Sequence, residues 1–207
     1  FEGSDSTIWP NVASIGDNKV VIAWCKDAGG SANGIAVVGT VSGTSISFGT
    51  EVVFDAVGKY NAVASIGDSK VVIAYRDDGD SDKGKAIVGT VSGTSISFGT
   101  AVVYNDAGTA NVDVGSIGSS KVVIAYSDTG NSNYGTAIVG TVSGTSISYG
   151  SEVVFESVSI TQPTVSSIGN DRVQITYRDS ATEGGQATTI TGAVSGTAIA
   201  FSDLTTF

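Results

Sequence analysis

The chain has 207 residues, of which 41% are hydrophobic and 28 are glycine, and its formal net charge is −10. This length and hydrophobic content predict a folded chain with its own core. The acidity excludes nucleic acid as an expected partner, because phosphate binding requires a basic surface. The absence of histidine excludes a Ser–His catalytic pair and histidine-based metal sites. No apolar stretch is long enough to cross a bilayer, so membrane insertion is not expected.

The first strongly apolar segment is residues 20–25, which ends at Cys25, the single cysteine of the chain. A lone cysteine in an apolar run is typical of a small core residue, and we predict that role for it. It can form no intrachain disulfide, and no histidine is present to activate it as a nucleophile.

The chain repeats itself four times. The sequence GTVSGTSISFGT at 39–50 returns unchanged at 89–100, and in altered form at 140–151 and 192–203. Repeats with this period predict four segments of the same shape within a single domain spanning 1–207. Their approximate bounds are 1–54, 55–104, 105–155 and 156–207.

The second unit shows the predicted elements of all four. Turns at 67–69 and 92–94 and a polar loop at 77–84 separate its extended segments. The second segment alternates with period two and is apolar on both faces, which is typical of a strand between stacked sheets. Each unit is therefore predicted to form a four-stranded antiparallel sheet. The four extended segments of this unit are 62–66, 71–76, 86–91 and 95–98.

The sequence KVVIAYRDDG at 70–79, followed by GKAIVGTVSGTSISFGT at 84–100, resembles the blade repeats of β-propellers. More narrowly, it resembles repeat arrays in marine phage tail or adhesion proteins and in secreted proteins of aquatic organisms. The resemblance implies an all-β fold: a four-bladed β-propeller, or a four-blade segment of a larger propeller. It also implies a scaffold that is used for binding or display. We predict that the chain is non-enzymatic and is extracellular, secreted or on a virion surface.

An aromatic residue recurs late in the second strand of every unit, and two of the four have an arginine beside them. An aromatic ring can stack on the apolar face of a sugar while nearby polar groups bind its hydroxyls. The alternative is that these rings pack between blades, one in each unit. The candidates are Trp24, Tyr75, Tyr126 and Tyr177, with Arg76 and Arg178.

The segment at the start of each unit varies most, and we predict it to be a loop that is free to bind a ligand. Trp9 and Tyr60 are predicted exposed platforms in these loops, with Asn11, Asn61 and Asn111 as polar candidates. Trp9 could instead cover one end of the core.

The loop 77–84 carries alternating carboxylates at Asp78, Asp80 and Asp82. This pattern resembles the start of a calcium loop, although the glycine comes one place late and no terminal glutamate follows. The alternative is a solvated hairpin loop in which the first aspartate caps its own turn. Calcium is the only cofactor that the sequence suggests.

Three functions remain after these exclusions. The first is a lectin-like module that binds a glycan or glycoprotein through repeated sites, without catalysis. The second is a structural or adhesion-fibre protein that self-associates as a homo-oligomer or contacts a neighbouring structural protein. The third is a glycosidase, which would need a matched pair of carboxylates or an arginine cluster, and the sequence shows neither.

Overall fold

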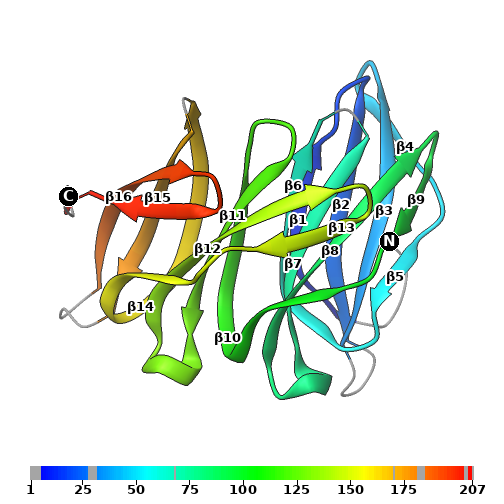
Figure 1. Cartoon of the computed structure of the whole chain (residues 1–207). Coiled ribbons are helices and arrows are strands. Elements are labelled where there is room, and N and C mark those ends of the chain that lie inside the picture. Colours follow the sequence, from blue (N-terminus) through cyan, green and yellow to red (C-terminus); the bar gives the residue numbers. More distant parts are fainter. Residues whose placement is uncertain are drawn as a thin grey trace.

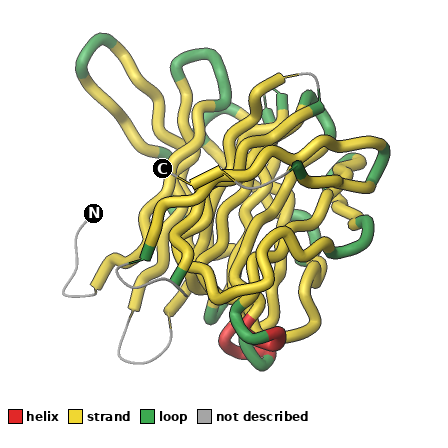
Figure 2. Tube along the Cα trace, turned by 90° about the vertical axis from the view of Figure 1, so that its left-hand side faces the viewer, coloured by secondary structure: helices red, strands yellow, loops and turns green. Residues whose placement is uncertain are grey.

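The structure, a computed structural model, describes residues 6–27, 32–67, 69–169, 171–180, 185–202 and 205–206. Within them the chain is all-β, and its only helical segments are two short 3-10 turns, η1 (Asp78–Asp80) and η2 (Thr129–Asn131). Both turns lie at one edge of the molecule, which we call the η edge (Figure 2). No helix among the described residues is long and apolar enough to cross a membrane.

The described residues contain eighteen strands, and the colours of Figure 1 follow the chain from its N-terminal side (blue) to its C-terminal side (red). Their bounds are β1 (Ser6–Ser14), β2 (Lys19–Asp27), β3 (Ala32–Ser42), β4 (Ser45–Phe48), β5 (Val52–Asp55), β6 (Gly58–Ile66), β7 (Lys70–Asp77), β8 (Lys83–Ser92), β9 (Ser95–Phe98), β10 (Val102–Ile117), β11 (Lys121–Asp128), β12 (Tyr134–Ser143), β13 (Ser146–Tyr149), β14 (Val153–Gly169), β15 (Arg172–Asp179), β16 (Gln186–Ser195), β17 (Ala198–Phe201) and β18 (Thr205–Thr206).

Each repeat supplies one antiparallel sheet, and we call these sheet one to sheet four after their second strands, β2, β7, β11 and β15. In sheet one, β1 pairs with β2 and β2 with β3, while β3 also pairs with β4 and, further along, with β5. Sheets two to four repeat this pattern. In them, β10 and β14 each run from the outer edge of one sheet to the inner edge of the next. The strands predicted at 86–91 and 95–98 are confirmed as β8 and β9.

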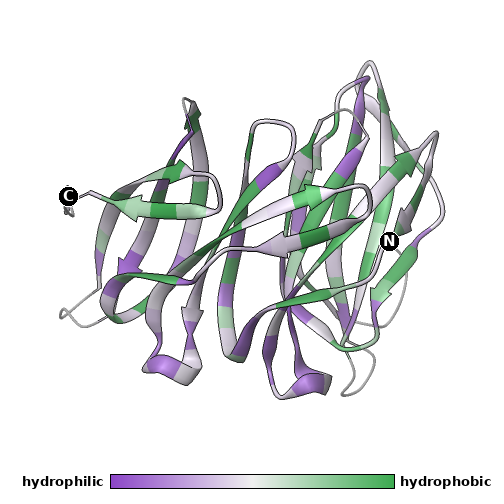
Figure 3. Ribbon diagram, viewed as in Figure 1, coloured by the Kyte–Doolittle hydropathy of each residue, from purple (hydrophilic) through white to green (hydrophobic). Residues whose placement is uncertain are grey.

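The sheets stack face to face, and the two faces of each sheet differ. In sheet two the first face carries Val71, Ile73 and Tyr75, and the second face carries Val72 and Ala74; all five are fully buried. The second face of each sheet packs on the first face of the next, which produces three apolar clusters. Figure 3 shows hydrophobic residues along the strands and hydrophilic ones at the η edge. The predicted burial of the second strand on both faces is confirmed.

The repeated glycine after the fourth strand marks the closest approach between neighbouring sheets. A Cβ atom at Gly99 would overlap the backbone carbonyl oxygen of Thr145 in the hairpin of the next sheet. Gly49 meets Thr94 in the same way, and Gly150 meets Thr197. Only a residue without a side chain allows this backbone contact. The recurring SISFG or SISYG sequence thus makes the same backbone contact at each of the three interfaces between sheets.

The segments predicted to be loops at the start of each unit lie inside strands, so that prediction is wrong. Each inner strand contains a β-bulge, where the register with the second strand shifts. The residue at the bulge has a positive φ in all four units: 50° at Trp9, 49° at Tyr60, 49° at Asn111 and 53° at Gln162. A bulge can hold unlike side chains at one backbone position, and this explains why the segment varies while the strand persists.

Two of the bulged strands bind the next sheet through a side chain. Asn11 Oδ1 accepts a hydrogen bond from the Val63 backbone N–H at 3.4 Å, and Asp113 Oδ2 accepts one from Val165 at 2.6 Å. The two acceptors occupy equivalent positions in sheets one and three. Burial raises the pKa of Asp113, against the two backbone hydrogen bonds that lower it.

Replacing Asp113 with asparagine, the residue that sheet one has there, is expected to flatten the pH dependence of stability. Because the folded pKa is raised, the folded chain holds more protons than the unfolded chain from about pH 4 upward. The free energy of unfolding therefore falls as pH rises through that range, and Asp113→Asn removes this fall while keeping an acceptor for Val165. Thermal unfolding between pH 4 and 7 measures it, with exposed Glu51→Gln as the control. A variant that is less stable than the parent at pH 7 would contradict the argument.

Cys25 is fully buried, as predicted. Its thiol donates to the Gly58 carbonyl at 2.9 Å and accepts from Asn61 Nδ2 at 3.0 Å. Burial raises the pKa of this thiol, with smaller opposing effects from Asn61. The residue is therefore a neutral part of the interface between sheets one and two.

Candidate functional site

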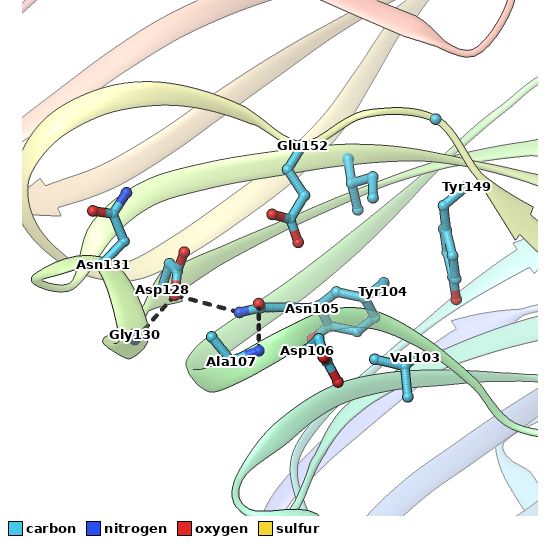
Figure 4. Close-up of a pocket in the computed structure, with 12 residues that line it drawn as sticks. Val103, Tyr104, Asn105, Asp106, Ala107, Asp128, Gly130, Asn131, Tyr149 and Glu152 are labelled. Carbon is cyan, nitrogen blue, oxygen red and sulfur yellow. Dashed lines mark hydrogen bonds between the residues drawn. The ribbon is translucent and has the colours of Figure 1, made fainter.

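An open pocket of about 640 Å³ lies where sheet two meets sheet three (Figure 4). Four segments form it: the kinked part of β10, the end of β11 with η2, the middle of β12, and the segment that leads from β13 into β14. We call it the β10 pocket. Its lining residues are Val103, Tyr104, Asn105, Asp106, Ala107, Asp128, Gly130, Asn131, Ile138, Tyr149, Gly150 and Glu152.

Short-range hydrogen bonds fix the polar groups of the β10 pocket. Asp128 caps η2, because its Oδ1 accepts from the Gly130 backbone N–H at 3.0 Å. The same oxygen accepts from Asn105 Nδ2 at 3.4 Å, and Asn105 Oδ1 accepts from the Ala107 N–H at 2.9 Å. The side chains of Asp128 and Asn105 are thus held in place before any ligand arrives.

Tyrosines form the wall of the β10 pocket. The Tyr104 ring lies 5.2 Å from the Tyr126 ring and 6.1 Å from the Tyr149 ring, centroid to centroid. Glu152 and Asp128 extend toward the same space (Figure 4). Burial raises the pKa of Glu152, a hydrogen bond with Tyr126 opposes this, and the charge of Asp128 adds to it. The site is therefore acidic and partly desolvated, with an aromatic side.

The equivalent place between sheets one and two is filled by a lysine. Lys85 Nζ lies 2.6 Å from Asp77 and 2.9 Å from Asp80, and Asp77 caps η1 as Asp128 caps η2. At the position of Lys85, sheet three carries Thr136, which is buried. Thr136 carries no amine, so Asp128 has no lysine partner from this position.

All four aromatic residues predicted late in the second strand are buried, and three of them, Tyr75, Tyr126 and Tyr177, lie between sheets. Tyr75 packs on Phe54, Tyr126 on Tyr104 and Tyr177 on Phe155, with ring centroids 5.2–5.3 Å apart. Trp24 is 2% exposed and belongs to a small cluster in sheet one. The positions of the three tyrosines are those of the packing alternative, since neighbouring aromatic rings pack against them.

The structure brings three predicted residues together near the η edge. Trp9, 36% exposed, packs on Tyr60 with centroids 4.3 Å apart, and the Arg76 guanidinium lies 4.8 Å from the centre of the Tyr60 ring. Asp78 holds this group in place through Arg76 at 2.6 Å and Lys59 at 2.5 Å. Trp9 keeps part of its surface open, so this aromatic cluster is a second place where a sugar ring could stack.

The other predicted polar residues lie apart from this cluster. Asn61 is buried against Cys25, and Asn11 accepts from the next sheet. Asn111 occupies the bulge of sheet three and is half-buried. Arg178 is exposed on sheet four, where it lines a separate depression of about 300 Å³.

The aspartates of the predicted calcium loop each face a basic side chain. Asp78 pairs with Arg76 and Lys59, Asp80 pairs with Lys83 and Lys85, and Asp82 lies 3.6 Å from Arg76. Asp77, the first aspartate of the loop, caps its own turn by accepting from Gly79 N–H at 2.8 Å, as the alternative predicted. In the part of the chain that the structure describes, no group of three or more His, Cys, Asp or Glu is arranged to hold a metal ion. Calcium stays a prediction.

The sequence analysis missed the acidic and amide residues of the β10 pocket. A signal was present, because in three units the VVF or VVY sequence that comes after the fourth strand is followed by a polar residue. These residues are Asp55, Asn105 and Glu156. In sheets two and four the tyrosine hydroxyls donate to them, Tyr75 to Asp55 at 2.8 Å and Tyr177 to Glu156 at 2.7 Å.

No family model and no curated protein matches the chain. Solved structures do match. A variant of Aleuria aurantia lectin in complex with α-methyl-L-fucoside is 12% identical, with a TM-score of 0.56, over 94% of this chain and 60% of that one. A structure of the fungal lectin described as a six-bladed β-propeller with a novel fucose recognition mode gives 12% identity and a TM-score of 0.54, over 90% and 56%. A leech intramolecular trans-sialidase gives 13% identity and a TM-score of 0.52, over 86% and 28%.

The chain thus spans about 60% of the length of the lectins that it matches. At such identity the likeness concerns the fold and not the ligand. The four stacked sheets, their repeated contacts and these matches together indicate an all-β, propeller-like fold.

Proposed function

We propose that this chain is a non-enzymatic carbohydrate-binding module of four propeller blades, one for each sheet, that binds a neutral glycan in the β10 pocket. The observation that carries the proposal is an open pocket at a blade interface, lined by fixed carboxylates, amides and tyrosines. A lectin that binds fucosides has the same fold, which adds support. The module would act outside the cell or on a virion surface, where glycans are displayed.

The chemistry of the β10 pocket favours hydroxyl groups as ligands. Ionised carboxylates only accept hydrogen bonds, and sugar hydroxyls donate them. Asp128 and Glu152 would accept from two hydroxyls, and the Tyr149 ring would cover an apolar face of the sugar. An acidic pocket repels sialylated or sulfated glycans, so the expected ligands are neutral, fucosides among them.

Replacing Thr136 with lysine is expected to lower the affinity for a glycan by at least about tenfold. The new ammonium would reach Asp128 as Lys85 reaches Asp77, and it would fill the β10 pocket. Thr136→Val, which keeps the size and adds no charge, is the matched control and should bind as the parent does. A glycan array followed by titration calorimetry measures both, and thermal unfolding verifies the fold.

Two outcomes would refute the β10 pocket as a glycan site. One is an array that stays silent for every neutral glycan. The other is a folded Thr136→Lys variant that binds as tightly as the parent. If glycan binding persists in that variant but is lost in Trp9→Ala, the aromatic cluster is the site instead.

The glycosidase and assembly hypotheses predict other results. A glycosidase would release sugar from a bound substrate, which the same calorimetry samples can be assayed for. An assembly role is favoured by one specific observation, an uncovered apolar surface on sheet one.

A further inference from the structure

Sheet one has an apolar groove of about 480 Å³ on its first face, in the half nearest the hairpin between β3 and β4. We call it the sheet-one groove. Val12 is 60% exposed and Ile46 is 44% exposed there, while Val20, Ile22 and Val41 are half-buried. The other half of this face is covered, since Trp24, Ile35 and Val37 are buried.

The same positions are buried in the next three sheets. The equivalents of Val12 are 5–9% exposed, and those of Ile46 are 4–5% exposed. In each case the second face of the preceding sheet covers them. The sheet-one groove therefore carries the side chains of an interface whose other half is missing. The equivalents are Val63, Val114 and Val165 for Val12, and Ile96, Ile147 and Ile199 for Ile46.

The covering face has a constant chemistry at all three interfaces. It consists of two valines and two alanines on the second and third strands, and every one of them is fully buried. Small side chains let the larger valines and isoleucines of the next sheet approach closely. The three sets are Val21, Ala23, Ala36 and Val38 in sheet one, Val72, Ala74, Ala86 and Val88 in sheet two, and Val123, Ala125, Ala137 and Val139 in sheet three.

Sheet four departs from this pattern at all four positions. It carries Gln174, Thr176, Thr189 and Thr191, which are half-buried. Gln174 bonds to Thr189, Thr191 Oγ1 donates to Gln174 Oε1 at 3.0 Å, and Thr189 Oγ1 donates to the Ile175 carbonyl at 3.2 Å. A polar face satisfied within itself closes a repeat array, as a capping repeat does. It offers a poor surface for the sheet-one groove.

We infer that the sheet-one groove docks a β-sheet that presents the Val–Ala–Ala–Val face of another repeat of this type. The partner is recognised by apolar shape, with two valines and two alanines seated on Val12, Val20 and Ile46. The polar face of sheet four prevents an identical copy from filling this role. The four described sheets thus have an apolar outer face on sheet one and a polar outer face on sheet four.

The inference can be tested by building the Val–Ala–Ala–Val face onto sheet four of the same chain. A full-length variant with Gln174→Val, Thr176→Ala, Thr189→Ala and Thr191→Val presents it on sheet four. Sedimentation velocity is expected to show the parent as a monomer and the variant as dimers and larger head-to-tail species. Adding Val12→Asp and Ile46→Asp to the variant should return it to a monomer. Circular dichroism and thermal unfolding verify that each chain is folded.

Three results would overturn the inference. The first is a folded fourfold variant that stays monomeric at high concentration. The second is an association of that variant that persists after Val12→Asp and Ile46→Asp are added. The third is association of the parent chain through Val12, because a second copy would then be the partner. If the fourfold variant does not fold, the double variant Gln174→Val and Thr191→Val, which keeps the two central threonines, is tested in the same way against the parent.

Discussion

Replacing Gly99 with alanine is expected to lower the free energy of unfolding by about 3 kcal/mol. The new methyl group would overlap the Thr145 carbonyl, which belongs to the backbone of the neighbouring sheet and cannot move away as a flexible side chain could. Sheets two and three must therefore separate locally, and their shared core loses contacts. Urea unfolding followed by tryptophan fluorescence and circular dichroism measures the change.

The control for this variant is Gly93→Ala. Gly93 has a φ of 61°, and a Cβ atom there would meet no atom within 4 Å. Its replacement tests backbone strain alone, with an expected cost of about 1 kcal/mol. A loss at Gly99 no greater than the loss at Gly93 would show that the close approach does not matter for stability.

Replacing Val72 with glutamine is expected to cost about 3–5 kcal/mol, because it buries an amide without partners in the cluster between sheets two and three. The reverse change at the equivalent position, Gln174→Val, is expected to alter stability by less than about 1 kcal/mol, because that face is half open. The pair tests whether the two ends of the array differ. Equal effects at both positions, measured by urea unfolding, would contradict the assignment of sheet four as a polar cap.

Period-two alternation and repeated glycines were enough to predict the second, third and fourth strands of the second unit, but not the inner strands that run through the predicted loops. The segment 95–98 follows a clear turn signal and forms β9, and burial of 71–76 on both faces followed from its composition. The bulge was not predictable in the same way. Trp9, Tyr60, Asn111 and Gln162 share a backbone conformation but no side-chain chemistry, so the sequence shows variation where the structure shows a common feature.

The site depended on contacts between units, and single-unit patterns do not reveal those. The Tyr126 ring is packed and does not serve as a surface for a sugar, because it contacts the ring of Tyr104, which lies in another repeat. The difference between Lys85 and Thr136 is visible in the sequence. The effect of this difference on the pocket could be understood only from the structure, where both positions lie near a carboxylate that caps a turn. Asp77 was predictable as a cap because that interaction is local.

The glycine contact joins equivalent atoms at each of the three interfaces, and this bears on how such a chain changes in length. A duplication that inserts a whole repeat between two existing ones reproduces every contact without any new compensating mutation. A deletion of part of a repeat breaks the contact on both sides. Growth and shrinkage in steps of about 50 residues are therefore the tolerated changes.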